Sequence, residues 1–87
     1  MTTTQDLSSR LTAAILAYDA EGASELAREL VHTAPDPASA LQAAMATAAA
    51  ELGASYEDGS VFVPHLVLAG RAMEAAADAL RRALPAA

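Results

Sequence analysis

Few side chains in this sequence could do chemistry, and they form no catalytic or metal-binding pattern. The absence of cysteine excludes disulfides, thiolate metal ligands and cysteine nucleophiles. Glu57 and Asp58 are adjacent carboxylates. Acid and base catalysis needs a shaped, partly dry pocket, however, and a turn of this kind is usually solvated. We therefore expect no catalytic residue, no metal site and no enzyme activity in the chain itself.

The two histidines are best interpreted as helix-end residues. A neutral imidazole can bind a metal such as cobalt, and His65 could in principle serve as an upper axial ligand. Its spacing matches no metal motif and the chain offers it no neighbouring ligand set, so a solvated histidine at a helix start is the better interpretation. His32 fits the end of an earlier helix, where a cation complements the helix dipole.

Composition points to one small all-helical domain. The chain has 87 residues, 54% of them hydrophobic and only 3% aromatic, so small side chains must build the core. Alanine, the strongest helix former, supplies much of the apolar fraction. The net charge of −6 argues against binding nucleic acid, which needs clustered Lys and Arg. No apolar run reaches the roughly 18 residues that cross a bilayer, and no signal peptide is visible, so we expect a cytoplasmic protein without membrane contact.

Apolar residues recur at helical spacing in four segments, which predicts four helices. The segments run from Leu7 to Tyr18, Ala23 to Val31, Leu41 to Leu52 and Leu66 to Leu80. Short connections between them imply antiparallel neighbours, so the predicted fold is an all-α four-helix bundle that lacks a Rossmann-like domain. Residues 1–87 form a single helical domain in this interpretation, with 1–6 disordered.

Local signals place the boundaries between these helices. Asp19 is a good N-cap for the second helix, and Asp36 for the third, where Pro37 fits the first turn. The segment 56–60 predicts a tight turn before the fourth helix, with Gly59 in the left-handed backbone region. Pro64 then fits the first turn of that helix.

The turn carries a family resemblance. Residues 52–69 read LGASYEDGSVFVPHLVLA and are followed by Met73. This run resembles the signature of the helical cap of corrinoid proteins, G-x-x-[FYW]-x-x-G-x-[FIM]-[FIY]-[LV]-P. The resemblance extends from about Leu11 to Leu84. The family includes cobalamin-dependent methionine synthase and the corrinoid proteins of methanol and methylamine methyltransferases.

The resemblance implies a site for cobalamin at this turn. In the family the four-helix domain precedes a Rossmann-like cobalamin domain and covers the upper face of the cofactor. Tyr56 matches the aromatic residue that lies over the corrin, while Val63 and Leu66 match the apolar residues around the upper axial ligand. His65 stands where relatives usually have Gln and is taken as a further cofactor-facing residue. Phe62 matches a buried anchor, so we expect it in the core.

The resemblance also implies partners. The 87 residues end before the family's Rossmann domain and its Asp-x-His-x-x-Gly motif. We therefore expect cobalamin to be shared with a Rossmann-type corrinoid-binding domain or methyltransferase subunit, with weak or absent binding by this chain alone. The alternative is a structural helical bundle that has lost cofactor contact and serves as an interaction or homodimerisation module.

Overall fold

Four helices account for most of the computed structural model, which describes residues 2–85. They are α1 (Thr4–Leu16), α2 (Ala20–Thr33), α3 (Pro37–Glu57) and α4 (Val63–Ala83), and no strand occurs within the described range. The predicted all-α, four-helix fold is confirmed. No helix in the described part of the chain is both long and apolar enough to cross a membrane.

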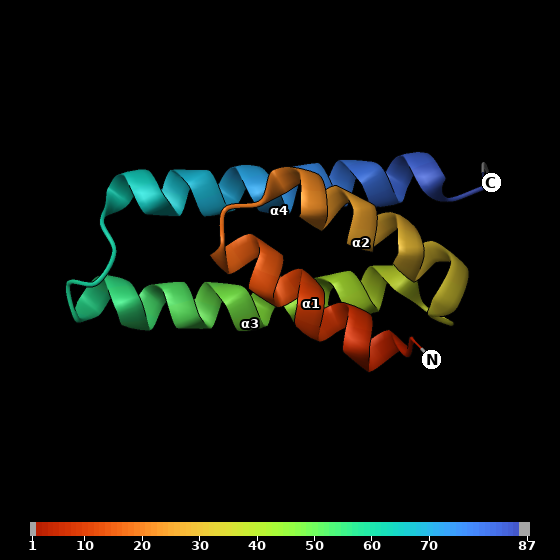
Figure 1. Cartoon of the computed structure of the whole chain (residues 1–87), viewed down its shortest axis with the longest axis horizontal. Helices are drawn as coiled ribbons and strands as arrows, with labels where there is room; N and C mark the ends of the chain where they lie inside the picture. Colours follow the sequence, from red (N-terminus) through yellow and green to blue (C-terminus); the bar gives the residue numbers. More distant parts are fainter. Residues whose placement is uncertain (1, 86–87) are drawn as a thin grey trace.

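The two long helices frame the molecule. In Figure 1, α3 and α4 run antiparallel along its length, and the shorter α1 and α2 cross between them near the end that holds both termini. Helix α2 packs mainly along α4 and α1 mainly along α3, whereas α3 and α4 contact each other little. The α3–α4 turn therefore lies at the end of the molecule that α1 and α2 cover least (Figure 1).

Alanines make up half of the core. Eight of the sixteen buried hydrophobic residues are alanines, and no polar or charged residue is buried among those described. The largest fully buried side chains come from α1 and α2: Leu7, Leu11, Ile15 and Leu30. Small side chains let helix backbones approach closely, so the core depends on close packing and not on large aromatic groups.

The predicted caps of α2 and α3 are confirmed. Asp19 Oδ1 accepts a hydrogen bond from the Gly22 N–H at 2.9 Å, and Asp36 Oδ1 accepts one from the Ser39 N–H at 3.2 Å. The hydroxyl of Ser39 also donates to Asp36, and these two bonds, the hydroxyl first, lower the pKa of the Asp36 carboxyl. Each carboxylate thus pairs with a backbone N–H that the helix leaves free.

Three boundaries differ from the sequence prediction, and one of them is the end of α1, which stops at Leu16 and leaves Tyr18 in the α1–α2 turn. Thr3 caps α1, which begins at Thr4, so residues 4–6 are helical and the expected disorder of segment 1–6 is wrong there; Met1 lies outside the described residues. Helix α3 continues to Glu57, so Tyr56 is helical and the turn is shorter than expected. The first helix can start early because the Thr3 hydroxyl accepts from the N–H of Asp6 at 3.1 Å.

Candidate functional site

The α3–α4 turn is set by local backbone chemistry. Gly59 has a φ of +83°, so the left-handed conformation predicted for it is confirmed. Asp58 Oδ1 accepts from the N–H of Ser60 at 2.8 Å and also from the Ser60 hydroxyl, and these bonds, the hydroxyl first, lower the pKa of the Asp58 carboxyl. The turn therefore holds the end of α3 and the start of α4 in a defined relation.

Exposed apolar side chains gather around this turn. Six large hydrophobic residues are exposed in the described chain, and five of them lie between positions 56 and 68. We call these five the apolar end: Tyr56, Phe62, Val63, Val67 and Leu68. The sixth, Leu84, lies at the opposite end of α4. A small domain with a buried core has no need for such a concentration, which is typical of a contact surface.

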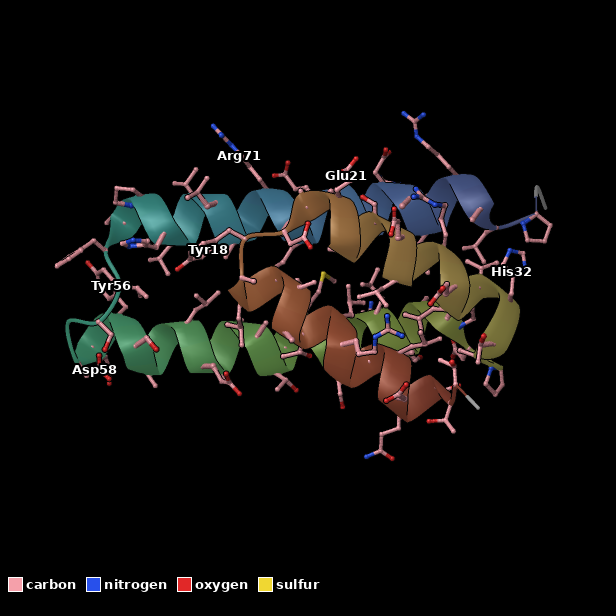
Figure 2. All side chains as sticks on the ribbon, in the orientation of Figure 1. Tyr18, Glu21, His32, Tyr56, Asp58 and Arg71 are labelled. Carbon is pink, nitrogen blue, oxygen red and sulfur yellow. The ribbon has the colours of Figure 1, made fainter. Side chains whose placement is uncertain are left out.

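The residues expected to face a cofactor lie at the apolar end or beside it. Tyr56 is 49% exposed in the last turn of α3, and Val63 is 57% exposed as the first residue of α4. Figure 2 shows Tyr56 and Asp58 at this end, far from His32. Leu66 is half-buried and packs against the core, so less of its side chain can reach a ligand.

The expected burial of Phe62 is wrong. Its side chain is 62% exposed. Phe62 is the N-cap residue of α4, with extended backbone angles, and so precedes the buried residues of α4, the first of which is Ala69. The family resemblance and the large apolar side chain both predicted a buried anchor, but the direction of the ring depends on the turn. Phe62 therefore adds a large aromatic group to the surface.

His65 is held by a backbone hydrogen bond. Its Nδ1 accepts from the N–H of Phe62 at 2.9 Å, the bond by which an N3 side chain reaches back to the backbone of the N-cap residue. A neutral imidazole that accepts at Nδ1 carries its proton on Nε2. Neither ring nitrogen then offers a free lone pair to a metal, which argues against His65 as a cobalt ligand. The ring can still donate a hydrogen bond through Nε2.

Sequence reasoning missed the contact between Tyr18 and His65. Tyr18 lies in the α1–α2 turn, and its ring stacks on the His65 imidazole with centroids 5.8 Å apart and planes inclined by 27°. The Phe62 ring also lies beside this imidazole, with centroids 6.1 Å apart and planes tilted by 34°. The apolar pattern indicated only that Tyr18 closes the first helix. Nothing in the local sequence links it to a residue so distant along the chain.

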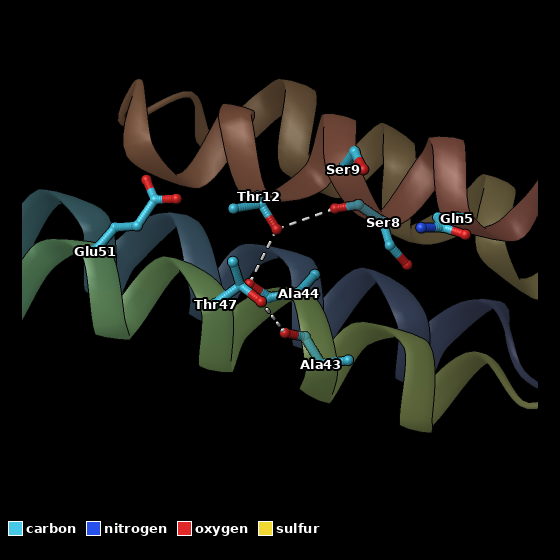
Figure 3. Close-up of a pocket in the computed structure, with 8 residues that line it drawn as sticks. All are labelled: Gln5, Ser8, Ser9, Thr12, Ala43, Ala44, Thr47 and Glu51. Atoms are coloured by element: carbon cyan, nitrogen blue, oxygen red, sulfur yellow. Dashed lines mark hydrogen bonds between the residues drawn. The ribbon is translucent and has the colours of Figure 1, made fainter.

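A second candidate site is lined mainly by alanines and uncharged polar side chains. Figure 3 shows a groove between α1 and α3 in which the Thr12 hydroxyl lies 3.1 Å from the carbonyl oxygens of both Ser8 and Ala44. The hydrogen bond to Ala44 joins α1 to α3. Glu51 is the one ionisable residue that lines the groove. Within residues 2–85 no three His, Cys, Asp or Glu side chains approach closely enough to hold a metal ion.

Comparison with known proteins gives the class of this helical module. The family model described as B12 binding domain matches residues 7–81. The chain therefore belongs to the B12 binding domain family, which confirms the resemblance to the helical cap of corrinoid proteins. The matched range includes the whole α3–α4 turn and the apolar end.

Particular relatives are corrinoid proteins. The chain is 27% identical over 81 residues to trimethylamine corrinoid protein 1 of Methanosarcina acetivorans, and equally to that of Methanosarcina mazei. In each case the alignment covers 93% of this chain and 38% of the relative, so the chain spans well under half of their length. No solved structure matches the chain.

Proposed function

We propose that this chain is a cobalamin cap, which covers the upper face of a corrinoid held by a Rossmann-type domain in a methyltransferase-type system. The observation that carries the proposal is the apolar end: a member of the B12 binding domain family exposes its large apolar side chains at the turn that bears the family signature. The chain itself has a non-catalytic role in this account.

The residues at the turn fit a corrinoid by their chemistry. A corrin ring is broad and flat, and the exposed side chains of Tyr56, Val63 and Phe62 can cover such a face without binding its metal. His65 offers an N–H donor and no free lone pair in its present arrangement. Cobalamin, when bound, supplies a cobalt that carries a methyl group.

The role of the side chains is to exclude water and oxygen. A reactive group between turnovers survives longer where apolar surface replaces solvent around it. By the family resemblance, Tyr56 would lie over the corrin ring, with Val63 and Leu66 around the upper axial ligand and His65 as a further cofactor-facing residue. Access for a methyl acceptor then requires the cap to move aside, which is a gating step and not chemistry by the cap.

Binding energetics favour a shared site. Full burial of an apolar side chain of this size gives about 1.5–3 kcal/mol. Tyr56 and Val63 are already about half covered and Leu66 more so. The three together therefore retain roughly 2–5 kcal/mol, against an association cost of about 4–15 kcal/mol. Contact with a corrinoid-holding domain must provide the difference, so weak or absent binding of cobalamin by the isolated chain is part of the proposal.

The proposal is tested by mapping which surface binds. A Rossmann-type corrinoid domain loaded with methylcobalamin is titrated with the wild-type chain and with Tyr56→Ala, Val63→Ala and the matched control Leu84→Ala. Heat of binding is recorded. Each change at the apolar end should weaken binding by roughly four- to tenfold, from the loss of about half a side-chain burial. Leu84→Ala removes an exposed apolar side chain from the other end of α4 and should have no effect.

The alternative gives a different result. A structural module without cofactor contact would use the same apolar end to form a homodimer or to hold another protein. Sedimentation of the wild-type chain would then show a dimer that Tyr56→Ala dissociates, and methylcobalamin-loaded domain would not bind. That pair of results would replace the cap by an interaction module.

A further inference from the structure

Tyr18 has a backbone conformation that residues other than glycine rarely adopt. Its φ is +62°, the one positive value at a non-glycine position in the described chain. The Tyr18 N–H donates to the Ile15 carbonyl at 3.0 Å, and the Asp19 N–H donates to the Ala14 carbonyl at 2.9 Å. These are the two hydrogen bonds of a Schellman motif, whose left-handed residue is usually glycine.

A tyrosine at this position has a conformational cost that glycine would avoid. Such a cost persists where the surrounding structure holds the residue in place, and it is frequently found near functional sites. The ring of Tyr18 is half-buried and packs against the edge of the core. In Figure 2 it leaves the α1–α2 turn beside α4, on the side of the α3–α4 turn. The gain that offsets the cost therefore comes from what the ring contacts.

The contact leads directly to the start of α4. The Tyr18 ring stacks on His65 at 5.8 Å, and His65 Nδ1 in turn accepts the N–H of Phe62 at 2.9 Å. Phe62 immediately precedes Val63, the first residue of α4. An imidazole that is stacked on one side and hydrogen-bonded at one nitrogen has little freedom to rotate. Through it, the α1–α2 turn holds the end of α4 that α1 and α2 otherwise cover least.

We propose that Tyr18 is a positioning residue of the cap: its stack on His65 fixes the imidazole and the first turn of α4, so that Val63 is held ready against the corrinoid. This inference rests on the proposed cap function. It adds Tyr18, from the α1–α2 turn, to a site formed by the α3–α4 turn. It also gives His65 a second role, which is to hold the first turn of α4 in place. It also explains a tyrosine where local conformation favours glycine.

Two substitutions at Tyr18 separate positioning from stability. Tyr18→Gly removes the ring and also the left-handed strain. Because glycine is the residue that this position of the turn prefers, we expect the chain to stay folded. Tyr18→Phe keeps the ring and should behave like the wild type. Leu84→Ala is the control for a remote loss of apolar surface. Circular dichroism establishes that all four proteins have the same helical content.

The first measurement is nuclear magnetic resonance of His65 in the isolated chain. In the wild type the ring protons should be shifted by the tyrosine ring current, and the nitrogen shifts should report a proton on Nε2. Tyr18→Gly should lose the ring-current shift and give averaged nitrogen signals, while Tyr18→Phe restores both. The second measurement is binding to the methylcobalamin-loaded corrinoid domain, which Tyr18→Gly should weaken by roughly two- to tenfold, the range of one aromatic contact.

Each result has a distinct meaning. Unchanged His65 signals in Tyr18→Gly overturn the inference, whatever the binding shows. Altered signals with wild-type affinity show a contact that supports only the fold, and they overturn the positioning role as well. If the wild-type chain does not bind the loaded domain at all, the proposed function itself fails, and the role of Tyr18 toward a corrinoid fails with it. Weaker binding by Tyr18→Gly, restored in Tyr18→Phe, supports the inference.

Discussion

Gly22 allows a sharp test of how α2 begins. It is the third residue of α2, and its N–H donates to Asp19 Oδ1 at 2.9 Å. A Cβ added at this position would stand 2.3 Å from Asp19 Oδ2 and 2.8 Å from Asp19 Cγ, so Gly22→Ala must displace the capping carboxylate. Gly53 is the matched control, because a Cβ there would meet nothing within 4 Å on the exposed side of α3.

Two effects of similar size oppose each other in Gly22→Ala. Replacing glycine by alanine in a helix stabilises it by up to about 1 kcal/mol, and loss of an aspartate N-cap costs about 0.5–2 kcal/mol. The net change in the free energy of unfolding should therefore lie near zero or be unfavourable. In an Asp19→Ala background the carboxylate is absent, so Gly22→Ala should stabilise by about 0.5–1 kcal/mol, as Gly53→Ala should in the wild type.

Urea unfolding of the single and double variants measures these values. The double-mutant cycle should give a coupling free energy of about 1 kcal/mol between Asp19 and Gly22. Gly53→Ala should show no coupling to Asp19, since Asp19 caps α2 whereas Gly53 lies in α3, where an added Cβ meets nothing within 4 Å. If Gly22→Ala stabilises the wild type as much as Gly53→Ala does, the close approach to the cap is wrong.

Three further outcomes follow from the turns, the caps and the exposed ring. Gly59→Val should lower the midpoint of thermal unfolding through a loss of at least about 1 kcal/mol, since φ is +83° there; an unchanged midpoint would argue against the turn. The folded-state pKa of Asp36 is lowered by the Ser39 hydroxyl and N–H, so its stabilisation is present above the unfolded pKa and is lost as pH falls through the folded one. Asp36→Asn should reduce the loss of unfolding free energy at acid pH, and identical pH profiles of stability for the two proteins would count against the hydrogen bonds between Asp36 and Ser39. Phe62→Ala should change the free energy of unfolding by less than about 0.5 kcal/mol, whereas Leu11→Ala should lower it by about 2–5 kcal/mol; equal losses would contradict the exposed position of Phe62.

Local signals in the sequence were sufficient for most of the fold. Asp19, Asp36 and Gly59 each act within three residues of their own position, so their types and neighbours predict the caps and the turn. Helical periodicity identified four helices for the same reason. Only the helix ends differ from the prediction: α1 runs from Thr4 to Leu16, and α3 continues to Glu57.

The site was predicted less completely because it depends on contacts between distant segments. The signature placed Tyr56 and Val63 at the turn, and the structure exposes both. The exposure of Phe62 depends on the direction of the turn, and the stack of Tyr18 on His65 depends on how α1 and α2 cross the long helices. No local sequence pattern predicts either the exposure of Phe62 or the stack of Tyr18 on His65.

The proposed role of this chain is to cover a corrinoid that another domain holds. The most direct measurement titrates methylcobalamin into the isolated chain, and then titrates the chain into a Rossmann-type corrinoid domain loaded with methylcobalamin, following the visible spectrum and the heat of binding. We expect no micromolar binding in the first titration and a saturable complex with a changed cobalamin spectrum in the second. Micromolar or tighter binding by the chain alone, or no association with the loaded domain, would contradict it.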